Sequence, residues 1–535
     1  MGKRNKPRVT TGSPAGNNST ISNSGKSVVE TADVDPVQTI CSDLVAVCSQ
    51  PWPEDTTAQW ALFTEAFGQL ESIRQHQLSQ PLSFTSPDRL SALPRFLSWC
   101  RDEQELEVSP AIRIGPACGV AAVDSKDGSS QLGLICDQPL QLGDLVARVP
   151  RAAMLSTDLI QANPDYSSVF RLDPILSSMP NVALAMLVLC EKLKGPGSGW
   201  RPYLEIMPRQ FSLPLYFQLA DFDQLRSGGS PVLVEAMRLV INIGRQYGYF
   251  YQLLAAGNRS YLARLPGLSR ASFTYEAYRW AVSLVMTRLN VIPPLGEVHG
   301  APGVPALIPL WDLANHAEGP TCTDYQDGCG ICYAQRDFQP GQEVTICYGT
   351  RSNPALLVNN GFLMDDVPER CVLDVRLGLS KKDPSFDLKQ GLLARFDLQP
   401  AQTYQLRQDC LIREQPIFLF AVIFSAPESE LRSAADLLLN QSPFTPDLSD
   451  PSKHLLDAVG SETLDKAVQF LSVRFSLLLR SYSLTPEQIE QQLSARESTI
   501  SETRGLVLRL LRTELKLLQW AVDQLNQKTS GEALE

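Results

Sequence analysis

The chain has 535 residues, of which 44% are hydrophobic and 20% charged, with a formal net charge of −11. This length predicts two to four domains with sizeable cores, and the composition is that of an ordinary globular protein. The negative charge, and the lack of a basic stripe with interleaved aromatic residues, argue against direct nucleic-acid binding. The longest apolar runs, 182–190 and 417–424, are too short to span a bilayer, so we expect no membrane insertion.

Residues 1–35 are rich in Ser, Thr, Asn, Gly and Lys and have almost no large apolar side chains. Such a segment buries too little surface to offset its ordering entropy, so we expect a disordered polar arm. Its basic start, 3–8, has no apolar stretch behind it, which argues against a secretory signal. A nuclear address and a solvated tail are the two interpretations of these charges.

Twelve cysteines are scattered without the spacing of a secreted disulfide framework, which favours a reducing compartment. The cluster at 322, 329, 332 and 347 holds a single Cys-x-x-Cys and lacks the second pair of a zinc site, so we expect no metal. We therefore expect a soluble cytoplasmic protein and leave a nuclear fraction open.

The apolar spacing over residues 36–107 predicts an N-terminal helical segment. Short β-like segments punctuated by glycine follow at 112–114, 119–123, 133–136 and 144–149. Helical patterns return between about 157 and 286, with a buried helix at 181–190 and another at 273–286. The second begins with a capping-box pattern at Thr274 and Glu276. A helical block therefore interrupts a β domain.

Strands are expected again at 304–310, 330–334, 344–347 and 372–377. The remainder of the chain is predicted to be largely helical. Thr485 and the proline after it predict a helix start, and a broad leucine stripe over 505–525 predicts a packed helix face.

Two of these apolar runs end in polar residues. The first ends in Asn315 and His316, and the second ends in Tyr348. Either run could be an ordinary strand that stops at a surface turn. The occurrence of two such ends predicts instead that they meet at one pocket.

Several enzyme classes lack their motifs here. No Gly-x-Gly-x-x-Gly follows a strand, and no Gly-x-Ser-x-Gly elbow occurs. The chain has four histidines. A dinucleotide site, a Ser-His-Asp hydrolase and a multi-histidine metal centre are therefore poorly supported.

The two strand ends, with segments 278–288, 308–312 and 348–353, resemble the SET-domain protein methyltransferases of the Rubisco large-subunit methyltransferase-like class. The similarity covers about 80–480 and is greatest to members that methylate a histidine of actin. It implies an α+β fold with a pseudoknot of short β-sheets in a SET domain at 108–349. A helical insert at about 157–286 and a mostly helical substrate-binding domain at 366–535 are also implied. The methyl donor would be S-adenosyl-L-methionine, the protein substrate actin, and the chain a monomer.

The resemblance also implies a role for individual residues. The cofactor pocket would comprise Arg89, Gln131, Leu132, Gly133, Asn181, Arg288, Asp312, Leu313, Ala314, Asn315, His316, Asn360, Gly361 and Phe362. Arg89 would bind the cofactor carboxylate, and the 131–133 turn would run along the cofactor. Tyr348 would stand at the methyl channel, while Trp311 and Arg351 would hold the target peptide. From the sequence alone, Asn181 could instead cap a helix, and Phe362 could belong to the core.

Asn290 bears on the choice of target. Methyl transfer from a sulfonium is an in-line displacement that needs a neutral nucleophile. The pKa is about 10.4 for lysine and about 6.5 for imidazole, so a histidine site needs orientation more than deprotonation. The resemblance places Asn290 where its amide could bond the second ring nitrogen, although a residue before Ile292-Pro-Pro294 could be part of a turn.

We therefore predict a histidine methyltransferase, with Tyr348 and Asn290 at the catalytic centre. Two alternatives stay open. One is a SET-domain lysine methyltransferase acting on a histone or another protein, and the other is a catalytically inactive SET scaffold.

Overall fold

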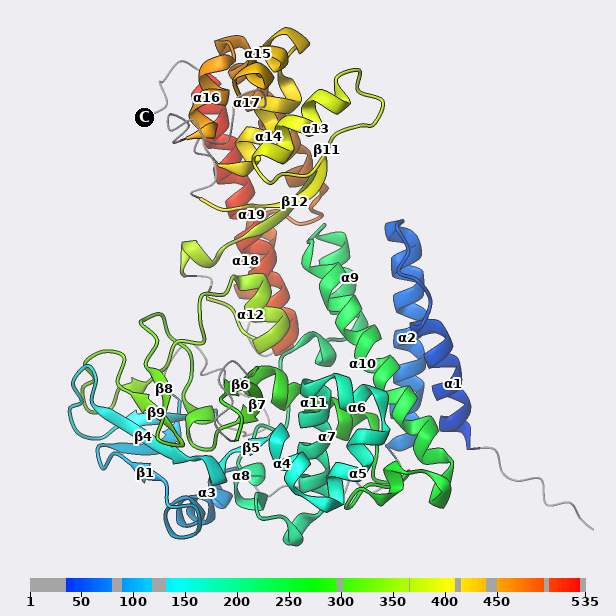
Figure 1. Ribbon diagram of the computed structural model, residues 1–535, viewed down its shortest axis with the longest axis vertical. Helices are drawn as coiled ribbons and strands as arrows, with labels where there is room; N and C mark the ends of the chain where they lie inside the picture. The colour runs from blue at the N-terminus through cyan, green and yellow to red at the C-terminus, as the bar shows by residue number, and fades with distance from the viewer. Residues whose placement is uncertain are drawn as a thin grey trace, which may run out of the picture.

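The computed structural model of the protein describes residues 35–78, 89–117, 131–295, 302–364, 366–408, 415–438, 450–494 and 500–529. The expected disordered arm, apart from Asp35, and the expected strand at 119–123 lie outside these ranges. Within them, three small antiparallel sheets lie beside a group of helices at one end of the molecule, and a mostly helical bundle occupies the other end (Figure 1). No described helix is long and apolar enough to cross a membrane.

The predicted N-terminal helices are confirmed. They are α1 (Pro36–Cys48), α2 (Thr56–Gln77) and α3 (Arg89–Ser98), the last followed by a π-helical turn at Trp99–Glu103. Asp35 and Asp55 cap α1 and α2 by accepting from backbone N–H groups. The apolar faces of α1 and α2 pack on α10 (Val232–Ala255), so these helices are part of the main body (Figure 1).

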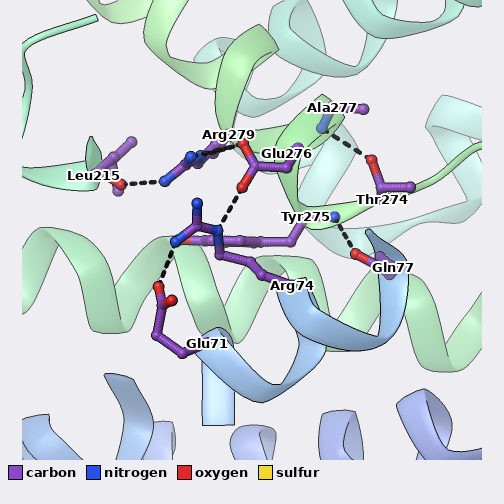
Figure 2. Close-up of polar contacts among 9 residues, drawn as sticks. All are labelled: Glu71, Arg74, Gln77, Leu215, Thr274, Tyr275, Glu276, Ala277 and Arg279. Carbon is purple, nitrogen blue, oxygen red and sulfur yellow. Dashed lines mark hydrogen bonds and ion pairs between the residues drawn. The ribbon is translucent and has the colours of Figure 1, made fainter. Parts of the chain in front are cut away.

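Polar contacts fasten α2 to α11 (Tyr275–Arg288), as Figure 2 shows. The amide oxygen of Gln77 accepts from the backbone N–H of Tyr275 at 2.9 Å, and Arg74 binds Glu276 at 2.5 Å. Thr274 caps α11 as predicted. The predicted capping box is wrong, because Glu276 is the second residue of the helix and its carboxylate binds Arg74 and Arg279.

Each of the three sheets pairs a strand from before the helical block with a strand from after it. Their orders are β1-β4-β9-β8, β10-β3-β2 and β5-β7-β6, all antiparallel. The strands before the block are β1 (Glu107–Val108), β2 (Ile112–Pro116), β3 (Leu132–Cys136), β4 (Leu145–Pro150) and β5 (Leu155–Ser156). Those after it are β6 (Asn290–Ile292), β7 (Val304–Leu307), β8 (Thr323–Gln326), β9 (Cys329–Tyr333) and β10 (Glu343–Val344).

Two expected strands are shorter than predicted. The strand expected at 304–310 ends at Leu307, because Leu310 has a left-handed φ of 68° and leads into a 3₁₀ turn at Trp311–Leu313. The strand expected at 344–347 has only Glu343 and Val344 in its ladder. Beyond them, Ile346 makes an isolated bridge to His316.

The predicted helical interruption is present. It consists of α4 (Thr157–Ala162), α5 (Pro164–Leu172), α6 (Pro174–Ser178), α7 (Pro180–Leu193), α8 (Arg201–Glu205), α9 (Leu219–Ser227), α10 and α11. Residues 182–191 of α7 are all buried, which confirms the buried helix predicted at 181–190.

The C-terminal part contains α12 (Asn353–Asn360), α13 (Phe386–Arg395), α14 (Pro416–Ser425), α15 (Glu428–Leu438), α16 (Pro451–Ala458), α17 (Ser461–Ser481), α18 (Pro486–Ser494) and α19 (Glu502–Thr529). It also holds the expected strand β11 (Leu373–Gly378), which pairs with β12 (Ala401–Leu406), a strand that the pattern analysis missed. The helix start predicted at Thr485 is confirmed by α18.

Helix α19 joins two hydrophobic cores. Leu506 to Leu515 contribute to the core shared by the N-terminal helices, the sheets and the insert. Leu517 to Leu525 belong to the core of the C-terminal bundle. Figure 1 shows α19 in red, running from beside α12 into that bundle. The leucine stripe predicted over 505–525 therefore covers one helix that serves both parts.

Candidate functional site

The two polar segments meet, as predicted, although both lie beyond the ends of β7 and β10. His316 and Ile346 form a parallel bridge. The backbone N–H of Ile346 donates to the carbonyl of Asn315 at 3.0 Å, and that of Ala317 donates to the carbonyl of Ile346 at 3.1 Å. Segments about thirty residues apart in the sequence are therefore held side by side by their backbones.

Aromatic rings stack at this junction. The backbone N–H of Tyr348 donates to Nδ1 of His316 at 3.1 Å, and the two rings stack with centroids 5.0 Å apart. Burial lowers the pKa of His316, so its imidazole is neutral at pH 7 and Nδ1 can accept this bond. The ring of Phe362 lies 5.9 Å from His316, so Phe362 belongs to the same cluster.

Tyr348 is held at its hydroxyl as well as at its backbone. The hydroxyl donates to the carbonyl of Ala314 at 2.7 Å. Burial raises the pKa of Tyr348 to about 12, so the phenol keeps its proton at neutral pH. Tyr348 can therefore act as a hydrogen-bond donor but is unsuited to act as a general base.

Glu343, which the sequence analysis did not single out, faces the junction from β10. Its carboxylate accepts from the side-chain amide of Asn315 at 2.5 Å. A Cβ added to Gly133 of β3 would lie 2.5 Å from a Glu343 oxygen and 3.3 Å from the Asn315 nitrogen. A side chain here would displace the Glu343 carboxylate, so glycine allows β3 to pack closely against Glu343 and Asn315.

Asp312 links the 3₁₀ turn to the insert and to β6. One carboxylate oxygen accepts from the hydroxyl of Tyr203 at 2.5 Å and from the backbone N–H of Ile308 at 3.1 Å. The other accepts from the side-chain amide of Asn290 at 3.4 Å. Burial raises the pKa of Asp312 to about 7, although the Tyr203 hydroxyl and the Arg288 charge act in the opposite direction.

Arg288, the last residue of α11, has a donor without an acceptor. Its Nη1 donates to the Thr287 hydroxyl at 2.7 Å, and its guanidinium lies 5.9 Å from the ring centroid of Phe211. Its Nε is buried and has no hydrogen-bond partner among the described residues. Buried guanidinium donors are normally paired, so this atom fits an anionic group of a bound ligand.

A second arginine is anchored beside the aromatic cluster. Arg351 donates to the side-chain oxygen of Asn360 at 2.8 Å. Gly361 ends α12 with a φ of 79°, and a Cβ there would lie 3.1 Å from the backbone of Ser212. The turn that carries Phe362 into the cluster therefore requires glycine.

The structure leaves several expected roles untested. Arg89 is buried and its Nε donates to the carbonyl of Ile206 at 2.7 Å. Asn181 is exposed in the first turn of α7, where Met179 and not Asn181 occupies the cap position. Trp311 is 8% exposed, with its ring against Gly330, so little of it can face a peptide.

The other expected residues lie in the segments already described. Gln131 precedes β3 and Leu132 begins it, while Leu313 ends the 3₁₀ turn and Ala314 follows it, both of them buried. In the described ranges, no cluster of three or more His, Cys, Asp or Glu side chains is arranged to hold a metal ion.

Comparison with known proteins identifies the family. The SET domain model matches residues 131–349, and the Rubisco LSMT substrate-binding model matches residues 380–518. The actin-histidine N-methyltransferase of Mus musculus is 30% identical over 497 residues, which cover 92% of this chain and 78% of that protein. The chain belongs to the actin-histidine N-methyltransferase family. The Homo sapiens member is also 30% identical, over 498 residues, with the same coverage.

Solved structures show the same fold. The structure of Rubisco LSMT bound to AdoMet aligns with a TM-score of 0.60 at 18% identity, over 83% of this chain and 93% of that one. The SET domain of LSMT bound to lysine and AdoHcy aligns with a TM-score of 0.61 at 17% identity, over 82% and 92%. The predicted α+β fold, with a SET domain and a helical C-terminal part, is confirmed.

Proposed function

We propose that this chain transfers a methyl group from S-adenosyl-L-methionine to a histidine side chain of actin. The relatives in its family carry that activity in their name. The observation that supports the target best is the fixed orientation of Asn290. Its amide nitrogen donates to Asp312 at 3.4 Å and to the carbonyl of Arg288 at 3.0 Å.

This orientation matters because an amide has one donating and one accepting end. With the nitrogen of Asn290 turned toward Asp312 and Arg288, the amide oxygen is the end available to a substrate. An oxygen accepts from the protonated nitrogen of a neutral imidazole and so selects one tautomer. The other ring nitrogen then presents its lone pair to the methyl group.

The residues at the junction fit the proposed methyl donor. S-adenosyl-L-methionine carries a carboxylate, and the unpartnered Nε of Arg288 would suit such an anion. The backbone of β3 at Gly133 and the cluster of His316 and Phe362 would complete the binding site. When bound, the cofactor supplies an electrophilic methyl group on a sulfonium.

Tyr348 would act by shaping the methyl channel, with its hydroxyl held by the bond that it donates to the carbonyl of Ala314. Its hydroxyl keeps its proton at neutral pH, because burial raises its pKa to about 12. No base is needed to prepare the target, because an imidazole with a pKa of about 6.5 is already mostly neutral at pH 7. We assign Arg351, fixed by its bond to Asn360, to the peptide, with Trp311 contributing only the small part of its side chain that is exposed.

The test is mass spectrometry of purified actin that lacks histidine methylation, after incubation with the protein and S-adenosyl-L-methionine. We expect a gain of one methyl group mapped to a histidine. Asn290→Ala should lower kcat by roughly a hundredfold while the cofactor still binds, because correct orientation is worth several kcal/mol. Tyr348→Phe should also lower the yield.

Asn242→Ala is the matched control, because Asn242 is exposed on α10 and should not affect methylation. Full activity of the Asn290→Ala variant would contradict the orientation argument. Methylation of lysine peptides without any gain on actin would replace the proposal with the lysine-directed alternative. Cofactor binding without transfer to either target would favour a scaffold.

A further inference from the structure

Asn353 is the first residue of α12, and the family resemblance implied no role for it. It is fully buried. Its amide oxygen accepts from the backbone N–H of Met364 at 2.8 Å, and its amide nitrogen donates to the backbone carbonyl of Met364 at 3.2 Å. The same nitrogen lies 3.7 Å from the sulfur of Cys371. One buried side chain therefore binds both backbone groups of a residue eleven positions later in the sequence.

Phe362 lies in the turn that this contact closes. The turn starts at Gly361, whose backbone N–H donates to two carbonyls of α12 at 2.9 and 3.2 Å. It ends at Met364. Between these two points, the ring centroid of Phe362 lies 5.9 Å from that of His316 and 6.4 Å from that of Tyr348. The backbone on both sides of Phe362 is therefore held by α12, at one side by its last turn and at the other by its first residue.

The N–H of Met364 depends on Asn353 more than the carbonyl does. The carbonyl also accepts from the backbone N–H of Val367 at 3.2 Å. Within the described ranges, the amide oxygen of Asn353 is the one acceptor found for the N–H. An N–H group that loses its acceptor away from water is costly, so the chain would move to find another. Loss of the Asn353 amide should therefore let the end of the turn, and with it Phe362, shift.

We propose that Asn353 is a positioning residue for binding of the methyl donor: by holding the backbone of Met364, it fixes the ring of Phe362 where the cofactor binds. The proposal rests on the function proposed above. Phe362 is half-buried, so part of its ring is left for a bound molecule. Aromatic rings stack on nucleoside bases, and S-adenosyl-L-methionine carries an adenine. Asn353 itself is buried beneath the turn and acts through Phe362.

Asn353→Leu removes both amide bonds and nearly keeps the size of the side chain. We expect the dissociation constant of S-adenosyl-L-methionine, measured by titration calorimetry on the full chain, to rise roughly tenfold, the scale of a lost contact between a base and an aromatic ring. The KM for the cofactor should rise equally, while kcat at saturating cofactor should change by less than about twofold. The two differ because Tyr348 is held by its own bonds to His316 and Ala314.

Gln77→Met is the matched control. Gln77 is also a buried amide that accepts from one backbone N–H, that of Tyr275 at 2.9 Å, and it donates to the hydroxyl of Tyr247 at 2.7 Å. It lies at the link between α2 and α11. Both variants should lower the melting temperature by a few degrees, because each leaves an N–H group without its acceptor. Only Asn353→Leu should weaken cofactor binding.

A double-mutant cycle tests whether Asn353 acts through Phe362. Phe362→Ala alone should weaken cofactor binding by roughly tenfold. Adding Asn353→Leu to it should weaken binding by less than about twofold further, because the ring that Asn353 positions is then absent. The melting temperature should still fall in the double variant. A role confined to stability would instead lower the melting temperature of Asn353→Leu and leave its dissociation constant unchanged.

The outcomes separate the two proposals. Unchanged cofactor affinity in Asn353→Leu, or losses of affinity that add in the double variant, would overturn the positioning role. If Asn353→Leu does not fold, Asn353→Ala takes its place with the same expected pattern, since the smaller side chain cannot clash. If the wild type binds the cofactor but methylates no histidine, the proposed function fails and the affinities still test Asn353. A wild type that binds no cofactor would overturn both proposals.

Discussion

The side-chain amide of Asn315 donates to the carboxylate of Glu343 at 2.5 Å, directly beside the backbone of Gly133. Three strand segments meet in this contact: β3, β10 and the segment after the 3₁₀ turn. The contact leaves no room for a Cβ, so the sequence at position 133 is set by packing between segments distant in the chain.

We expect Gly133→Ala to weaken S-adenosyl-L-methionine binding by roughly tenfold or more. The new methyl group would lie 2.5 Å from the Glu343 oxygen, so the carboxylate must move and its charge-assisted bond to Asn315 is lost or bent. Titration calorimetry of the cofactor on the purified variant measures the effect.

Gly68→Ala is the control for this substitution. None of the described residues lies within 4 Å of a Cβ at Gly68, which is exposed on α2. We expect unchanged cofactor affinity and about 0.5–1 kcal/mol of added stability, because alanine is a better helix former. Equal cofactor affinities for the two variants would refute the close-packing argument at Gly133.

We expect Gln77→Ala to lower the free energy of unfolding by about 1–3 kcal/mol. The side chain of Gln77 is buried, accepts from the backbone N–H of Tyr275 and donates to the hydroxyl of Tyr247 (Figure 2 shows the first bond). Truncation leaves the Tyr275 N–H buried without an acceptor. Urea unfolding followed by circular dichroism gives the difference.

Gln75→Ala tests whether the loss of stability in Gln77→Ala comes from the backbone N–H of Tyr275 losing its acceptor. Gln75 lies in the same helix but is exposed, so its loss should change stability by less than about 0.5 kcal/mol. Similar losses for both variants would indicate that helix propensity, and not the link between α2 and α11, explains the change.

The buried carboxyl group of Glu514 in α19 should make the stability of the folded protein depend on pH. It is buried, and it accepts from Ser230 at 2.8 Å and from Tyr482 at 2.9 Å. Burial raises its pKa to about 7, against about 4.3 in an unfolded chain. The folded protein therefore loses stability from this group as the pH rises from about 4.3 to about 7.

Glu514→Gln removes this ionisation. Between pH 4.5 and pH 7.5, we expect wild-type stability to fall relative to the variant by on the order of 3 kcal/mol. Denaturant titrations at the two pH values measure it. Glu490→Gln, at an exposed carboxylate that binds Arg512 at 3.2 Å, should show less than about 0.5 kcal/mol of such change. Parallel pH dependence in wild type and Glu514→Gln would contradict the prediction.

Much of the fold could be anticipated from periodicity. The buried helix α7 and the leucine stripe of α19 are local patterns that survive in the structure, because a run of apolar residues at helical spacing must be covered. The strand β12 was missed because only Tyr404 and Leu406 of it are buried, which makes its alternation weak. The strand that begins at Val304 is shorter than predicted, because an apolar run does not reveal the left-handed turn at Leu310.

The residues of the candidate site also fall into those that the sequence indicated and those that it did not. His316 and Tyr348 were found because each ends an apolar run, a signal carried by neighbouring residues. Glu343 and Tyr203 had no such signal, since each looks like an ordinary residue of its own element. Glu343 is part of the site because it binds Asn315, which is 28 positions away, and Tyr203 because it binds Asp312, which is 109 positions away.

Local patterns in the chain were thus enough to predict most helices, the polar segments that follow the two apolar runs and the family resemblance, because these depend on residues close in sequence. Which side chains meet, and whether Asp312 is charged when they do, depended on folding. Burial by distant segments removes water from the carboxylate, and the groups that compensate are the Tyr203 hydroxyl of α8, the Arg288 charge of α11 and the backbone N–H of Ile308. The ionisation of the site is therefore a property of the assembled core.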